Sequence, residues 1–320
     1  MNSVRRANSF ALWIMIVFVL GSFTISFILS LLPFSVDSTL ISLLRYILLF
    51  GVPILFYFRY TKQPVRHTLR LNPISLRQLL LVLAFSLLIQ PFLMFLSYLS
   101  GLVFHNFLDD SLTTKLQQSY PILILTMAVF PAIFEEITCR GVFLSGYRGV
   151  NVYTAALLNG LYFGMLHMNM QQFVYAFAFG FLCSLLVIGA DSILASMLAH
   201  FIINGVQVTL AYYTAQIQTS LSVSVSAAQG SSASALPSIL LAALTLPLAL
   251  LCLRGIFSSG GRLELLHGSR DENVPAVRKD PLSPSPVEPS PLSALRGGMK
   301  PFYIATIIFV IMCSLTEFLR

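Results

Sequence analysis

The sequence predicts an all-α polytopic membrane protein, with about eight to nine transmembrane helices around an intramembrane polar cavity. Composition predicts the class, because 57% of the 320 residues are hydrophobic and only 10% are charged, whereas an ordinary soluble domain is about 25% charged. Apolar runs near the roughly 20-residue length of a membrane span recur along the chain and predict the helices. A few ionisable residues inside these runs predict the cavity, because charge at membrane depth usually marks a functional site.

Apolar runs define the expected helices. The nine segments are 9–32, 38–58, 78–104, 121–143, 152–167, 172–189, 192–213, 237–254 and 301–318. The first resembles a signal peptide, but its length and the lack of a small-residue cleavage site after it favour a retained helix. The fifth and the last segments are short for a span.

Composition also divides the chain into five regions. They are 1–118 (N-terminal helices), 119–213 (core helices with most of the intramembrane polar residues), 214–256 (a Ser- and Ala-rich outside loop and the eighth helix), 257–300 (a disordered, Pro- and Ser-rich cytoplasmic linker) and 301–320 (the C-terminal transmembrane helix). The linker is expected to act as a tether, with a regulatory tail as the alternative.

The basic residues predict an orientation. The net charge of +7 comes mostly from a few loops and one tail, the pattern of the positive-inside rule, and does not indicate nucleic-acid binding. A cytoplasmic N-terminus places nearly all of them on the inside. Lys115 falls in an outside loop, and Arg45 is an exception, because it lies within the second segment and the sequence gives it no role. The four cysteines are scattered singly and are expected to be buried, inert thiols.

Polar residues within the core segments form a small set. They are Glu135, Glu136 and Arg140 in the fourth segment, Asn159 and His167 in the fifth, where the apolar Phe163 precedes His167 by four residues, and His200 and Asn204 in the seventh. Each charged residue at a helix centre costs roughly 2.5–3.5 kcal/mol on insertion scales. Taken singly, a histidine or asparagine here is more often a helix–helix hydrogen bonder. Together, on three neighbouring helices, they favour a common site.

Helical spacing sorts these residues. Glu136 and Arg140 are four apart with the acid first, the favoured order for an ion pair, which leaves Glu135 free of that pair. His200 and Asn204 share a helix face in the same way. The predicted depths in the membrane argue against a common site. Glu135 falls near the inside end of its segment, whereas His167 falls near the outside end of its own. Either the fifth boundary is wrong or that helix is short and ends in a protein-lined cavity.

Three motifs carry a resemblance to a known family. Glu135-Glu136-Ile-Thr-Cys-Arg140, Phe163-Gly-Met-Leu-His167 and His200-Phe-Ile-Ile-Asn204 fit Glu-Glu-x-x-x-Arg, Phe-x-x-x-His and His-x-x-x-Asn. In this order the sequence, over roughly residues 120–212, resembles the CPBP intramembrane proteases. That family includes type II CAAX prenyl endopeptidases and bacterial proteins linked to bacteriocin self-immunity.

The resemblance implies an eight-helix or similar core and a peptidase acting on a membrane-associated peptide or protein. It implies that Glu135 activates water, that His167 helps to hold this water, and that His200 and Asn204 stabilise the oxyanion. Glu136 and Arg140 would fix the helix and tune the site, with Phe163 in support. A carboxylate base and preorganised donors are the groups that peptide hydrolysis requires.

The sequence leaves alternatives open for both the cofactor and the function. Glu135, His167 and His200 would suffice as three ligands of a zinc site with an open position, but no His-Glu-x-x-His motif is present, and the metal-free mechanism uses the same residues. The competing function is a non-catalytic immunity or scaffold protein that binds a peptide. A proton-coupled transporter is the third, although no related halves appear in the sequence.

Overall fold

The protein is helical throughout its described part. The computed structural model describes residues 3–34, 36–104, 115–220, 232–267, 295 and 297–318. Within these ranges, seven helices are long and apolar enough to cross a membrane, and two shorter apolar helices, Val152–Leu166 and Lys300–Leu315, accompany them. The prediction of a polytopic all-α membrane protein is therefore confirmed, including the two short segments.

Several spans are built from consecutive helical pieces. In chain order the elements are α1 (Ser3–Leu31), α2 (Ser38–Tyr46), the π-helical η1 (Ile47–Gly51), α3 (Val52–Thr61), α4 (Val65–Thr68), α5 (Leu76–Leu88), α6 (Gln90–Gly101), α8 (Tyr120–Ile124), the π-helical η2 (Leu125–Val129), α9 (Phe130–Glu136), the π-helical η3 (Ile137–Phe143), α10 (Val152–Leu166), α11 (Met170–Ala190), α12 (Ile193–Ser220), α13 (Ser232–Ser259), the 3-10 helix η4 (Leu263–His267) and α15 (Lys300–Phe318). The second span thus comprises α2, η1 and α3, and the fourth comprises α8, η2, α9 and η3.

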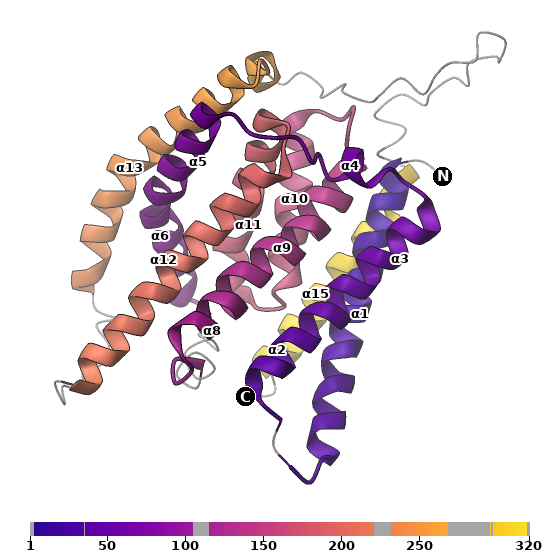
Figure 1. The fold of residues 1–320 in the computed structure, drawn as a ribbon, viewed down its shortest axis with the longest axis vertical. Coiled ribbons are helices and arrows are strands. Elements are labelled where there is room, and N and C mark those ends of the chain that lie inside the picture. The colour runs from indigo at the N-terminus through magenta and orange to yellow at the C-terminus, as the bar shows by residue number, and fades with distance from the viewer. Residues whose placement is uncertain are drawn as a thin grey trace.

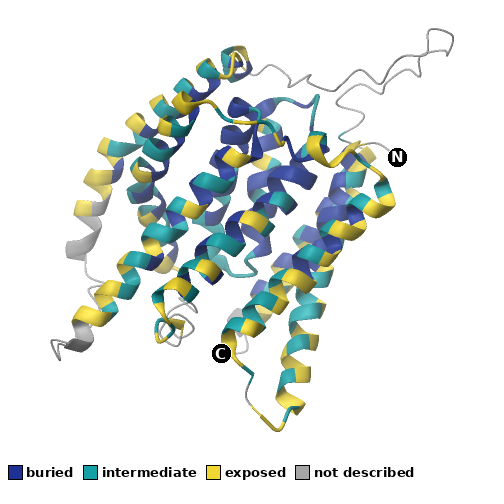
Figure 2. Ribbon diagram, viewed as in Figure 1, coloured by how far each residue is buried: buried dark blue, intermediate teal, exposed yellow. Residues whose placement is uncertain are grey.

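The helices form a central group with one group on either side (Figure 1). On one side α1 packs against α15 and against the second span, and on the other α13 packs against α5 and α6. The fourth span, α10, α11 and α12 lie between them and contact one another. Figure 2 shows the buried residues concentrated in this centre and exposed residues along the outer faces of the flanking helices. Those outer faces are apolar, as Phe23, Phe27 and Leu55 illustrate, which is the surface expected against lipid.

The hairpin of α10 and α11 gives the central group its tightest contact. Asn151 and Asn169 cap the two helices by accepting hydrogen bonds from backbone N–H groups of the first turn. Gly160 and Gly180 face each other where the helices cross, and a Cβ added at Gly160 would lie 2.8 Å from the backbone of α11. The small residues therefore permit the close approach that places the end of α10 in the core.

Polar contacts tie the elements together at both ends of the spans. At one end, Asp191 after α11 pairs with Arg70 at 2.8 Å and with Arg262 at 3.1 Å. At the opposite end, Gln118 donates a hydrogen bond to Ser38 at the start of α2. Among the described segments, the connection between α3 and α5 at the first end carries the basic residues Lys62, Arg66 and Arg70.

Helices extend into both the predicted outside loop and the predicted linker, so these segments are shorter than the sequence suggested. Helix α12 continues to Ser220 and α13 continues to Ser259, followed by η4, because a helix does not have to end where its hydrophobic run ends. The remainder of the predicted outside loop, 221–231, and most of the predicted linker, 268–294, lie outside the described residues.

Candidate active site

The fourth span presents Glu135 and Glu136 in different surroundings. Both lie at the end of α9, between the π-helical segments η2 and η3, and π-helical turns inside helices are frequent at functional sites. Successive helical residues point about 100° apart, so the two carboxylates face different neighbours. Glu136 is fully buried, whereas Glu135 is half-buried.

Glu136 is held by two cationic or polar partners. Arg140 Nη1 and His200 Nδ1 each lie 2.8 Å from its Oε1 atom, and both side chains are buried with it. The structure thus contains the ion pair that the spacing predicts, and it adds a contact from α12. A buried carboxylate with a buried guanidinium is stable only as a pair, because removing either partner leaves an uncompensated charge.

Phe163 lies at the centre of this cluster. The Arg140 guanidinium carbon is 4.2 Å from the centroid of its ring, the distance of a cation–π contact. The same ring meets His167 edge-on at a centroid distance of 5.0 Å and His200 at 6.0 Å. Phe163 therefore orients three of the polar residues, which gives physical content to its place in the motif.

The hydrogen bonds of the two histidines assign their tautomers. His167 Nδ1 lies 2.9 Å from the Phe163 carbonyl oxygen, and His200 Nδ1 lies 2.8 Å from the Glu136 carboxylate. Both partners are acceptors, so both Nδ1 atoms donate. A neutral ring then carries its lone pair on Nε2, where it accepts a hydrogen bond. His200 donates through Nε2 only in its imidazolium form.

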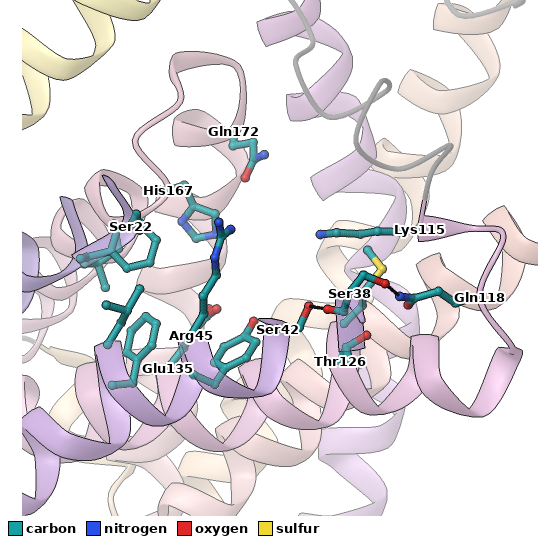
Figure 3. A pocket seen from close by; sticks show the side chains of 16 residues that line it. Ser22, Ser38, Ser42, Arg45, Lys115, Gln118, Thr126, Glu135, His167 and Gln172 are labelled. Atoms are coloured by element: carbon teal, nitrogen blue, oxygen red, sulfur yellow. Dashed lines mark hydrogen bonds between the residues drawn. The ribbon is translucent and has the colours of Figure 1, made fainter. Parts of the chain in front are cut away.

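Glu135 differs from Glu136 in its lack of a bonded partner in the described structure. Among the described residues no hydrogen bond or ion pair engages it. It lines a small cavity of about 100 Å³ together with Phe163, His167, His200 and Asn204. It also lines a larger cavity of about 370 Å³, again with His167 (Figure 3). Glu135 and His167 therefore stand where the two cavities adjoin.

The apparent conflict in depth is resolved by the length of α10. This helix has 15 residues, or about 22 Å at the α-helical rise, whereas the hydrocarbon core of a bilayer is about 30 Å thick. A helix of this length does not cross the core on its own, and His167 at its end lines the same two cavities as Glu135. Glu135 lies within the span Tyr120–Phe143 rather than at its end. The sequence alternative of a short helix ending in a protein-lined cavity is the one observed.

Asn204 has a structural partner in the fourth span. Its side-chain Nδ2 atom donates to the carbonyl of Met127 at 3.1 Å. Pro131 lies four residues after Met127 and has no N–H, so this carbonyl lacks its usual helical donor. Asn204 replaces that donor, and one of its two amide N–H groups remains for another acceptor.

Asn159 also donates to a backbone carbonyl of the fourth span, but it lies in the core. Its Nδ2 atom donates to the Cys139 carbonyl of η3 at 2.7 Å, and its Oδ1 atom accepts from Ser184 at 2.9 Å. It lines neither of the two cavities that contain Glu135. Its role is to hold η3 against α10 and α11.

Some residues of the site had no signal in the sequence. Phe179 meets the His200 ring at 5.0 Å and the Arg140 guanidinium at 5.8 Å, yet it is one of 26 phenylalanines with no motif around it. Tyr175 and Gln207 also line the small cavity. Arg45, which the sequence left unexplained, lines the large one.

The predicted zinc ligands do not form a ligand set. Across the described residues, no three His, Cys, Asp or Glu side chains are grouped closely enough to hold a metal ion. Glu135, His167 and His200 are therefore not grouped as the three protein ligands that a catalytic zinc site requires. The arrangement does not support the metalloprotease subtype.

Comparison with known proteins supports the resemblance seen in the motifs. Residues 117–206 match the family model described as "Type II CAAX prenyl endopeptidase Rce1-like", which confirms the predicted similarity to the CPBP proteases. Neither a search of curated proteins nor one of solved structures found a match. The matched segment contains all three motifs. At family level it supports an intramembrane CAAX endopeptidase with a peptide or protein substrate.

Proposed function

We propose that this protein, whose residues 117–206 match the type II CAAX prenyl endopeptidase Rce1-like family model, is an intramembrane endopeptidase in which Glu135 activates the attacking water. One observation carries the proposal. Glu135 is half-buried at the junction of two cavities and has no hydrogen-bond partner among the described residues, whereas adjacent Glu136 is held through its Oε1 atom by Arg140 and His200. A general base needs this freedom to accept a proton.

The geometry supports a role for each residue in the hydrolysis. A water between Glu135 and His167 would donate one hydrogen to the Glu135 carboxylate and the other to the lone pair on His167 Nε2. Glu135 takes the proton as the water oxygen bonds to the substrate carbonyl carbon. The proton then passes to the amide nitrogen as the carbon–nitrogen bond breaks. Glu135 ends as a carboxylate, ready for another cycle.

His200 and Asn204 are the proposed oxyanion donors. His200 would donate through Nε2 in its imidazolium form, while the Glu136 carboxylate, which also pairs with Arg140, accepts a hydrogen bond from its Nδ1 atom. Asn204 contributes the N–H that Met127 does not use. In one well-studied hydrolase, a single donor of this kind is worth about 2.7–4 kcal/mol. Both side chains line the small cavity beside Glu135, where the oxyanion would form.

The proposed activity is testable with purified protein in lipid vesicles. The probe is a prenylated peptide with a CAAX terminus and a dye at its other end, chosen from the family to which the matched segment points. We expect mass spectrometry to detect two fragments whose masses sum to that of the peptide plus one water. Absence of cleavage of this peptide and of membrane-protein digests would contradict the proposal.

The binding alternative predicts a different result in cells. If the protein only sequesters a peptide, a Glu135→Gln variant should protect a peptide-sensitive cell as well as the wild type does. A hydrolytic role predicts that this variant loses protection, because it removes the base but keeps the shape of the side chain. Equal protection at equal membrane abundance would favour binding over catalysis.

We further propose that the N-terminus is cytoplasmic, which is supported by the basic loops at one end of the spans. The large cavity then has its exposed rim, Ser38 and Lys115, on the opposite face. A membrane-impermeant maleimide should label Ser38→Cys in intact cells, and Arg66→Cys only after permeabilisation. The reverse pattern would invert the orientation.

A further inference from the structure

The large cavity contains a pair of cations beside the proposed catalytic carboxylate. Its volume of about 370 Å³ lies within the range of small-ligand pockets, roughly 300–1,000 Å³. The wall includes Arg45 from the second span and Lys115 from the segment before the fourth. In Figure 3 the Arg45 side chain extends toward His167, and Lys115 extends into the same space from the opposite side. Among the described residues that line the cavity, Glu135 is the only acid.

Arg45 is in a costly position for a cation. It lies about two turns inside the second span, where an uncompensated charge is unfavourable. Its described hydrogen bond goes to the hydroxyl of Ser26, a neutral acceptor, at 3.3 Å. A guanidinium has five N–H donors arranged to bind a planar anion through two of them. Nothing in the described structure uses that capacity.

Lys115 adds a second positive charge to the same space. Lys115 is exposed at the rim, and partial desolvation there, together with the nearby Arg45 cation, lowers the pKa of its ammonium group. No acidic partner for either side chain is found among the described residues. Two like charges facing one cavity repel each other, and a bound anion would remove that repulsion.

The two cations are placed by specific contacts. Gln118 donates to the hydroxyl of Ser38, which ties the segment after Lys115 to the first turn of α2. Ser42 donates to the backbone carbonyl of Ser38 at 2.9 Å and lines the same wall. Gln172 adds an amide on the side of His167. The cavity wall therefore combines polar and cationic side chains with Glu135 and His167.

We propose that Arg45 and Lys115 bind a carboxylate of the peptide substrate, so that the peptide lies along the large cavity with its scissile bond at Glu135. The inference rests on the proposed function. A carboxylate matches the bidentate geometry of a guanidinium and is the anionic group that unmodified peptides carry. It belongs either to the C-terminus of the substrate or to an acidic side chain near the cleavage site. Arg45 and Lys115 thereby determine specificity and take no part in bond breaking.

The test combines charge changes in the protein with charge changes in the peptide. The dye-labelled CAAX peptide is used in three forms: with a free C-terminal carboxylate, with a C-terminal amide, and with an amide plus a glutamate at the penultimate residue. Binding is measured by fluorescence in zwitterionic vesicles, and cleavage by KM and kcat. The variants are Arg45→Gln and Lys115→Gln. Arg59→Gln is the matched control, because this exposed arginine of the same span lies outside the cavity.

We expect each cavity variant to raise the Kd and KM of a carboxylate-bearing peptide by about tenfold or more, with kcat nearly unchanged. The amide peptide should not distinguish variant from wild type. Sensitivity limited to the free-acid form identifies the C-terminus, and sensitivity of the glutamate form identifies a side chain. Arg45→Lys should restore part of the affinity, because it keeps the charge.

Three results would overturn the inference: equal losses for acid and amide peptides, no loss for either, or the same loss in Arg59→Gln. A loss that appears only when anionic lipid is added would assign the cations to a lipid headgroup and would also overturn it. The binding measurement keeps the two proposals apart. If the wild type binds the free-acid peptide with this charge preference but does not cleave it, the carboxylate subsite stands and the endopeptidase function fails.

Discussion

Replacing Glu135 by glutamine is expected to lower the rate of peptide hydrolysis by about 10²–10⁴-fold, the usual contribution of a general base. Glutamine has nearly the same shape but cannot accept the proton of the attacking water. The fold should be unaffected, because in the described structure Glu135 has no hydrogen-bond partner and faces a cavity. Thermal unfolding in detergent should therefore give the same Tm as the wild type.

A matched substitution separates this effect from a general loss of negative charge. Glu264 lies on η4, is exposed, and lines neither of the two cavities. Glu264→Gln should keep wild-type activity and stability. Wild-type activity in Glu135→Gln would contradict the assigned role.

Replacing Glu136 by glutamine is expected to act first on stability, with a loss of about 3–5 kcal/mol, the typical cost of breaking a buried ion pair. The Arg140 guanidinium would remain buried without its counter-ion, and His200 would lose the carboxylate that orients it. Hydrolysis should also fall, because His200 faces the small cavity. The measurement is the Tm of the purified protein, compared with that of Glu135→Gln.

A paired substitution tests the reason for that loss. Converting Arg140 to methionine in the Glu136→Gln background removes the unpaired charge and keeps a long side chain against Phe163. Part of the lost stability should return, since the effects of residues in contact are not additive. A double variant that is less stable than Glu136→Gln by the full cost of Arg140→Met alone would contradict the ion-pair explanation.

Local features of the site were predictable from the sequence, because they follow from helix geometry. The spacing of Glu136 and Arg140 specifies one helix face, and the structure has them 2.8 Å apart. Apolar runs gave the spans, since lipid requires each span to be helical and apolar. The carbonyl freed by Pro131 also has a signal in the sequence, but its partner Asn204 is on a different helix.

Contacts between helices were not predictable in the same way. Nothing in the sequence fixes the packing of α12 on α9, so the bond from His200 to Glu136 appears only in three dimensions. The depth of each site residue in the bilayer was equally unpredictable, because the length of a hydrophobic run does not say where its helix begins in the bilayer. Arg45 was unexplained for the same reason, since its cavity is assembled from α1, the second and fourth spans and the turn after α10.

The central claim is that the wild type cuts a peptide that Glu135→Gln can only hold. The most direct measurement purifies Glu135→Gln from its own membrane, identifies the co-purifying peptide by mass spectrometry, and gives that peptide to wild-type protein in vesicles. We predict that the wild type converts it to two fragments with the uptake of one water, while the variant leaves it whole. An intact peptide after incubation with folded wild-type protein would contradict the account.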